Sequence, residues 1–128
     1  MKILIADDDR DQLAVREMLL TQSGFEPITA CDRDSALRAA TAEHPACALV
    51  DLRLPDEEGG LSLIRQLKAR DARLRIFVLT GGNPRQLDGR PERALVDEVI
   101  RKGSPSSALI LKLKDVERSA FPDPYRPA

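Results

Sequence analysis

Polar side chains follow several short apolar runs in this sequence, and their types suit a phosphoryl-transfer site. Aspartates end two of the runs, a threonine ends another, and a lysine follows the last, which gives the set Asp7 to Asp9, Asp51, Thr80 and Lys102. If the runs are neighbouring strands of a parallel sheet, their carboxyl ends meet at one edge. The sequence therefore predicts one shallow cleft that holds carboxylates, a hydroxyl and an ammonium group.

Such a cleft suits an aspartate that accepts a phosphoryl group with the help of a divalent cation. Clustered carboxylates repel one another and disfavour full ionisation, so a cation must compensate. Lys102 supplies one positive charge, and Mg²⁺ is the favoured ion because it binds one or two carboxylates together with water and a phosphoryl oxygen. Asp51 would attack phosphorus and form an acyl phosphate, while Lys102 and Thr80 would contact the transferred oxygens.

Hydrophobic patterning predicts the elements that position these residues. Nearly unbroken apolar runs are typical of strands buried on both faces, and they occupy residues 2–6, 47–50, 76–79 and 98–100, with a weaker run at 25–29. Amphipathic helical patterns occupy residues 10–22, 34–43, 58–70 and 105–119. With right-handed crossovers, this alternation predicts a doubly wound α/β domain whose ligand site lies at the strand carboxyl ends.

The helix ends and faces can be predicted in part. Asp9 is the expected N-cap of the first helix, and either Asp32 or Asp34 that of the second. Ser104 precedes Pro105, which suits the first position of the last helix. The first helix is expected to turn one apolar side to the core, formed by Ala14, Val15, Met18 and Leu19, with Arg16 and Glu17 on the other side.

Two stretches are expected to be irregular. Residues 81–96 contain glycines and prolines throughout, so a long helix cannot run through them, and a loop with at most a short helix near 91–96 is predicted. Residues 120–128 are proline-rich and are expected to form a C-terminal tail or the start of a linker. The predicted domain therefore covers residues 1–119.

Composition excludes several classes of function. The formal net charge of −1 over 128 residues gives no basic surface for nucleic acid or an anionic membrane. The apolar runs are far shorter than the roughly 20 residues needed to span a bilayer, and three carboxylates interrupt any N-terminal secretory segment. Cys31 and Cys47 form no metal or disulfide motif and are expected to be small buried residues. A cytoplasmic location is expected.

The sequence resembles the receiver domain of bacterial two-component response regulators from about residue 2 to about residue 117. The resemblance lies in four segments that occur in order at intervals typical of the family: ILIADDD, ALVDLRLPDEEGG, IFVLTGG and EVIRKG. The second segment also carries Pro55 and Gly59 at the family's distances from Asp51. The fold that this implies is flavodoxin-like, with five parallel strands in the order 2-1-3-4-5, helices on both faces and a short or irregular fourth helix.

The resemblance also implies a role for each site residue. Asp51 is the phosphoacceptor, and Thr80 and Lys102 contact the phosphoryl group, with Thr80 taking part in the switch. Asp8 and Asp51 bind Mg²⁺ through their carboxylates and Arg53 through its backbone carbonyl, while Asp7 assists through water. A histidine kinase or a histidine phosphotransfer protein donates the phosphoryl group, and the filled site changes the binding of a downstream protein. The chain is then a signalling protein that takes part in its own phosphotransfer, not an enzyme.

The sequence departs from the family pattern at three places. Gly103 stands where proline usually follows the lysine, and Val99 stands where an aromatic residue usually moves inward on phosphorylation. The irregular residues 81–96 replace the usual fourth helix. These departures favour an alternative hypothesis, a pseudo-receiver that binds partners without phosphorylation.

A second alternative is a phosphatase of the haloacid-dehalogenase type. Asp7 and Asp9 imitate its Asp-x-Asp nucleophile motif, and Thr80 and Lys102 follow in a similar order. That hypothesis leaves Asp51 unexplained and lacks an acidic pair at a strand end downstream of the lysine, since Asp115 falls in the last helix.

Overall fold

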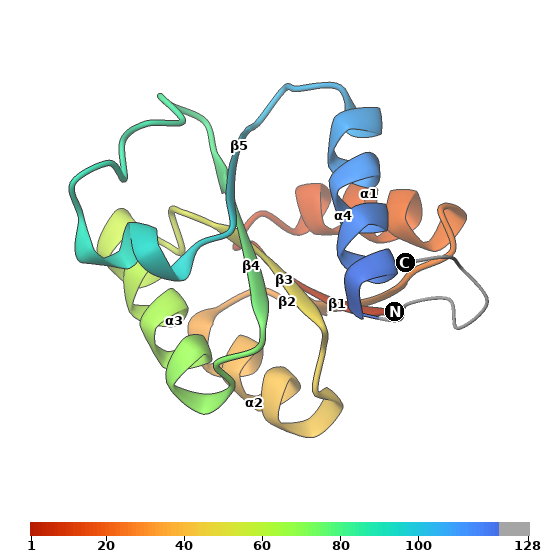
Figure 1. Cartoon of the computed structure of the whole chain (residues 1–128), viewed down its shortest axis with the longest axis horizontal. Helices are drawn as coiled ribbons and strands as arrows, with labels where there is room; N and C mark the ends of the chain where they lie inside the picture. Colours follow the sequence, from red (N-terminus) through yellow and green to blue (C-terminus); the bar gives the residue numbers. More distant parts are fainter. Residues whose placement is uncertain (121–128) are drawn as a thin grey trace.

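The computed structural model describes residues 1–120 as one central parallel sheet between two helical layers (Figure 1). The strands are β1 (Lys2–Ala6), β2 (Glu26–Ala30), β3 (Cys47–Asp51), β4 (Arg75–Thr80) and β5 (Glu98–Arg101). The helices are α1 (Arg10–Gln22), α2 (Arg33–Glu43), α3 (Glu57–Arg70), the 3₁₀ helix η1 (Pro91–Leu95) and α4 (Ser106–Ala120). The predicted proline-rich tail lies, apart from Ala120, outside the described residues.

The sheet has the strand order β2-β1-β3-β4-β5, and all four strand pairs are parallel. The predicted order is therefore confirmed. The carboxyl ends of β1 and β3 lie next to each other because these strands are parallel neighbours. The chain reverses its winding direction between them, and open α/β sheets bind their ligands at such a switch point.

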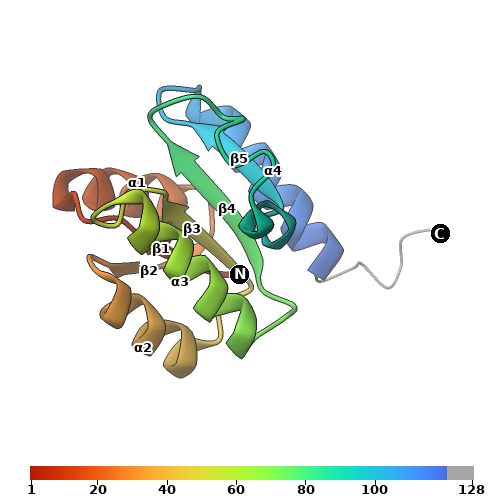
Figure 2. The same cartoon turned by 90° about the vertical axis from the view of Figure 1, so that its left-hand side faces the viewer.

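Helices cover both faces of the sheet (Figure 2), and one hydrophobic cluster lies on each face. Side chains of α2, α3 and η1 pack on one face, and side chains of α1 and α4 pack on the other. The central strand β3 is buried along its whole length, which explains why its sequence shows no alternation of polar and apolar residues. Among residues 1–120, no helix is long and apolar enough to cross a membrane.

The predicted irregular segment is confirmed. Residues 81–90 form a series of turns, and only η1 interrupts the path from β4 to β5. Leu87 is fully buried in the hydrophobic cluster between α3 and the sheet. Arg65 on α3 forms an ion pair with the buried Glu92 of η1 at 3.4 Å. The segment is therefore attached to α3 although it lacks a regular helix.

The predicted apolar face of α1 is wrong. Leu13 and Leu20 are buried, whereas Val15 and Met18 are each 63% exposed. The helix carries two apolar stripes, and only one can face the sheet. The stripe with Leu13 and Leu20 does so, and Arg16 on the same face pairs with Asp7 inside the fold.

The helix ends agree with the sequence, and one burial prediction does not. Asp9 accepts hydrogen bonds from the amides of residues 11 and 12, and Asp32, rather than Asp34, caps α2. The last helix begins at Ser106, one residue later than predicted, with Pro105 just before it. Cys47 is buried as expected, but Cys31 is only half-buried because it lies beyond the end of β2.

Candidate functional site

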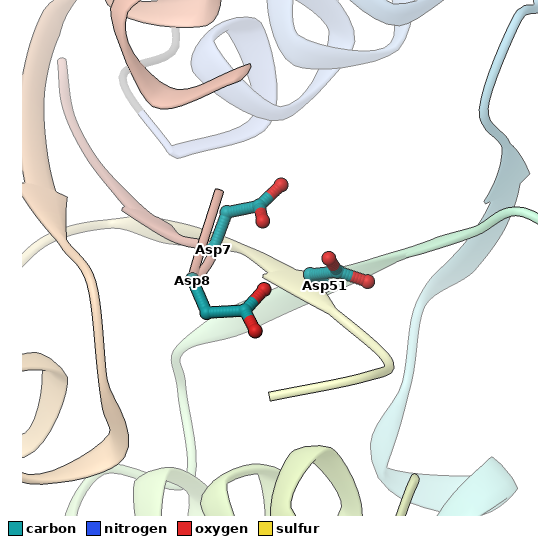
Figure 3. A group of neighbouring side chains, drawn as sticks. All are labelled: Asp7, Asp8 and Asp51. Carbon is teal, nitrogen blue, oxygen red and sulfur yellow. The ribbon is translucent and has the colours of Figure 1, made fainter. Parts of the chain in front are cut away.

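Three carboxylates gather where β1 and β3 end. One oxygen from each of Asp7, Asp8 and Asp51 lies within 4.8 Å of the others, and Figure 3 shows the three side chains over the ends of these strands. Asp7 and Asp51 are buried, while Asp8 is exposed to solvent. The predicted clustering is therefore present, and only one of the three carboxylates is well hydrated.

Lys102 supplies positive charge directly to this cluster. Its Nζ lies 2.9 Å from Asp51 Oδ2 and 3.9 Å from Asp7 Oδ2. The backbone of Lys102 is fixed because its N–H donates to the Thr80 carbonyl at 2.7 Å. The next residue, Gly103, has φ +89°, a conformation that glycine adopts without a steric cost. The glycine that replaces the family's proline thus lets the chain turn away while the ammonium stays in the cleft.

Arg16 is a second cation at the site, and it was not predicted from the sequence. Its Nη1 lies 2.6 Å from Asp7 Oδ2, and the side chain is only 11% exposed. A signal was available, since Leu13, Arg16 and Leu20 share one helical face. The apolar stripe beside it, containing Val15 and Met18, concealed that pattern.

The surroundings of Asp7 and Asp51 shift the pKa values of these two buried carboxyl groups in opposite directions. Burial raises the pKa of Asp7, but the hydrogen bonds from the Asp9 amide and from Arg16 outweigh it and hold the pKa below the ordinary 3.8. For Asp51, burial raises the pKa, and the bonds from Lys102 and from the Arg53 amide offset this only in part. The negative charge of Asp7 adds to the rise in the pKa of Asp51.

An open cleft of about 550 Å³ lies over these groups and brings in the predicted hydroxyl. Thr80 and Lys102 both line it, together with Asp8 and Asp51. Thr80 is buried, and its Oγ1 donates to Gln86 Oε1 at 2.8 Å. Gln86 was not predicted to lie here, because nothing in an irregular glycine-rich segment indicates which residue turns back toward the strand ends.

Two other singled-out residues have defined places. The Arg53 N–H donates to Asp51 Oδ1 at 3.1 Å, which fixes one carboxylate oxygen of Asp51. The role of the Arg53 carbonyl as a metal ligand stays a prediction. His44 caps the C-terminal end of α2 in the left-handed conformation, φ 48°, and lies just before β3 begins, whereas Asp51 lies at the other end of that strand.

The donor set fits a hard divalent cation. Carboxylate oxygens are the ligands that Mg²⁺ prefers, and the exposed Asp8 and the Asp51 carboxylate face the open cleft. Asp7 is bonded to Arg16 through Oδ2 and to the Asp9 amide through Oδ1. Both oxygens of Asp7 thus already have partners, which suits the indirect role that the resemblance implies.

Comparison with known proteins decides the family. Residues 3–114 match the sequence profile of the response regulator receiver domain. The chain belongs to this family. This receiver domain is 39% identical over 79 residues to the transcriptional regulatory protein PrrA of Mycobacterium tuberculosis, which is 62% of this chain and 34% of PrrA. It is 33% identical over 117 residues to a putative transcriptional regulator of Pseudomonas aeruginosa, which is 90% of this chain and 56% of that protein. The receiver domain thus spans about a third to about half of these relatives.

Solved structures agree with the fold. The response regulator TrrA of Thermotoga maritima, in complex with Mg²⁺ and BeF, has a TM-score of 0.80 at 22% identity and covers 90% of this chain and 97% of its own. NtrX of Brucella abortus, in complex with ATP, has a TM-score of 0.83 at 26% identity and covers 93% of this receiver domain but 27% of its own chain. The flavodoxin-like fold is therefore established.

The phosphatase alternative fails on geometry as well as on family. The Asp9 side chain caps α1 and is not paired with Asp7. Asp7, the required nucleophile, has a side chain that is 1% exposed and bonded to Arg16. The receiver domain instead presents Asp51 to the cleft.

Proposed function

We propose that this receiver domain accepts a phosphoryl group on Asp51 and thereby changes the binding of a partner protein. The observation that carries the proposal is the placement of Asp51 at the end of β3, 2.9 Å from the Lys102 ammonium and beside Asp7 and Asp8. An ammonium group and hard oxygen ligands around one carboxylate are what a transferring phosphoryl group requires.

The chemical step is a displacement at phosphorus. An Asp51 carboxylate oxygen attacks the phosphorus of a phosphohistidine, the P–N bond breaks, and the imidazole leaves with the electron pair. Asp51 Oδ1 is fixed by the Arg53 N–H, so the carboxylate needs no reorientation. Lys102, which now bonds Oδ2, lies where it would contact an oxygen of the new acyl phosphate.

Mg²⁺ completes the charge balance in this proposal. Asp8 and Asp51 would hold it through carboxylates, Arg53 through its carbonyl and Asp7 through water. When bound, the ion neutralises negative charge on the phosphoryl oxygens. The complex of TrrA with Mg²⁺ and BeF supports the choice of Mg²⁺ as the ion.

In this proposal Thr80 couples phosphorylation of Asp51 to the conformation of the rest of the chain. Its hydroxyl is buried at the end of β4, beside Asp51 across the β3–β4 ladder. In the phosphorylated state it would donate to a phosphoryl oxygen. Because that bond exists only when the site is filled, it favours one of two conformations and shifts the population between them.

The partners follow from this chemistry. The donor is a histidine kinase or a histidine phosphotransfer protein, and the downstream target is a protein. The formal net charge of −1 supplies no basic surface for nucleic acid, so DNA contact by relatives named as transcriptional regulators is not assigned to this chain. Both cysteines are free thiols, which suits the cytoplasm.

Intact mass measurement tests the proposal. The chain is incubated with a small acyl-phosphate donor such as acetyl phosphate, with and without Mg²⁺, beside the Asp51→Asn variant. We expect a gain of one phosphoryl group that hydroxylamine removes and that disappears in the variant or without Mg²⁺. No gain from this donor or from a panel of phosphorylated kinases would favour the pseudo-receiver, and labelling that survives in Asp51→Asn would place the acceptor elsewhere.

A further inference from the structure

The Thr80 hydroxyl has a single proton, and in this structure that proton is already used. Thr80 Oγ1 donates to Gln86 Oε1 at 2.8 Å and accepts from the Gly82 N–H at 3.1 Å. A hydroxyl can donate only one hydrogen bond. Thr80 therefore cannot donate to a phosphoryl oxygen while it donates to Gln86.

The position of Gln86 is built into the fold. Its neighbour Leu87 is fully buried in the hydrophobic cluster between α3 and the sheet. The Gln86 N–H donates to the Asn83 carbonyl at 3.0 Å. A Cβ atom on residue 82 would lie 3.0 Å from Gln86 Oε1, so the glycine there leaves the carboxamide room to reach Thr80.

The side chain at position 99 offers Thr80 no polar contact. Val99 on β5 is half-buried and packs against the hydrophobic cluster between α3 and the sheet. Its aliphatic side chain cannot form a hydrogen bond with Thr80. Gln86 is the polar side chain that joins Thr80 to the 81–90 turns. The signal from the phosphorylation site thus has a direct route into this segment.

We propose that Gln86 is a positioning residue whose carboxamide competes with the phosphoryl group for the Thr80 proton. In the unphosphorylated chain Gln86 holds the hydroxyl away from Asp51 and ties residues 82–86 to the end of β4. When Thr80 donates to the phosphoryl group, Gln86 is released and these turns open, while Leu87 stays in the core. This inference rests on the proposed function, because it requires that Asp51 be filled.

Titration with beryllium fluoride in the presence of Mg²⁺ tests the competition, with binding followed through the backbone amide signals. Gln86→Ala removes the competing acceptor, so we expect binding to tighten about 2- to 10-fold, the worth of one neutral hydrogen bond. Arg85→Ala is the matched control, since the Arg85 side chain lies in the same turn, is 84% exposed and among residues 1–120 bonds only Asp88. Binding by Arg85→Ala should equal that of the unmodified chain.

A double-mutant cycle separates competition from a general loosening of the segment. In a Thr80→Ala background there is no proton to compete for, so Gln86→Ala should no longer change the affinity. Gln86→Glu keeps an acceptor oxygen and should restore the position of the Gly82 amide signal in the unphosphorylated chain. Its added negative charge should at the same time weaken beryllium fluoride binding below that of the unmodified chain.

Two kinds of failure are distinguishable. Equal or weaker binding by Gln86→Ala relative to Arg85→Ala, in a chain that acetyl phosphate labels on Asp51, would overturn the competition and leave the proposed function intact. The same holds for an effect of Gln86→Ala that persists without the Thr80 hydroxyl. A chain that takes up neither beryllium fluoride nor a phosphoryl group would overturn both.

Discussion

Arg16 and Lys102 divide the neutralisation of the acidic cluster between them. Arg16 contacts Asp7 from the side of α1 at 2.6 Å, and Lys102 contacts Asp51 from the loop after β5 at 2.9 Å. A cation entering the cleft would therefore meet a charge balance that already contains two positive side chains. The affinity for Mg²⁺ should depend on how firmly each of them is held.

Replacement of Arg16 by glutamine should strengthen Mg²⁺ binding. The change removes a positive charge beside Asp7, and we expect the dissociation constant for Mg²⁺ to fall roughly 5-fold, equivalent to ~1 kcal/mol for a partly shielded unit charge. Calorimetric or amide-signal titration measures it. Arg10→Gln removes the same charge from the exposed start of α1 and should leave the affinity nearly unchanged. Equal effects of the two substitutions would show that only the overall charge matters.

The sequence allowed the acidic cluster and Lys102 to be predicted because each of these residues lies within two positions of the end of an apolar run. Asp7, Asp8, Asp51 and Lys102 needed only the rule that parallel strands end at one edge. Arg16 and Gln86 could not be found in that way. The first required the rotation of α1 about its axis, and the second required the path of an irregular segment, and both are fixed by tertiary packing.

At the scale of elements, the start of α3 is attached closely to the loop that leaves β3. Cβ atoms added to Gly59 and Gly60 would overlap the carbonyl groups of Leu54 and Leu52, respectively. These glycines thus let the helix approach the backbone that carries Asp51 and Arg53. The fit between α3 and this loop holds the segment that carries Asp51 in place.

Substitution of Gly60 by alanine should be severely destabilising. The added methyl group meets backbone rather than a flexible side chain, so we expect a loss of about 3 kcal/mol or more in the free energy of unfolding. Urea denaturation measures it. Gly81→Ala is the control, because no heavy atom lies within 4 Å of the added Cβ there, and its effect should stay below about 1 kcal/mol. Similar losses in the two variants would contradict the close approach.

Elements were easier to predict than their faces. The apolar runs of buried strands and the capping residues of helices are local signals. The strands β1 to β5 and the caps Asp9 and Asp32 could therefore be placed from the sequence. The core-facing side of α1 could not, because Val15 and Met18 form a second apolar stripe beside Leu13 and Leu20. The choice between two stripes depends on what each meets in the folded chain.

At the scale of the whole molecule, the acidic site weakens the fold in one place and strengthens it in another. Asp51 has a raised pKa, so the folded chain holds its proton more tightly than the unfolded chain, and ionisation of Asp51 costs folding free energy at neutral pH. Asp7 has a lowered pKa, so its ionised form stabilises the fold above its ordinary pKa of 3.8. Both effects act on one cooperative unit, because the two hydrophobic clusters share a single sheet.

Substitution of the two residues by asparagine should therefore change stability in opposite directions. Without divalent cations at pH 7, we expect Asp51→Asn to stabilise the chain and Asp7→Asn to destabilise it by about 1 to 3 kcal/mol. Urea unfolding between pH 3 and pH 8 measures both. The Asp51 difference should vanish as the pH falls through the raised pKa toward 3.8, and the Asp7 difference should persist to lower pH. Changes of the same sign would contradict the opposed pKa shifts.

The strand order leaves β2 at one margin of the sheet, and its sequence protects that margin against pairing with another chain. The Glu26 N–H donates inward to the Met1 carbonyl at 3.0 Å, so by the alternation of a strand the backbone groups of residue 27 face outward. That residue is a proline and has no N–H to offer. At the opposite margin, β5 has only four residues and charged side chains at both ends. A foreign strand therefore finds an incomplete ladder at either margin, which guards a protein with so apolar a sheet against edge-to-edge aggregation.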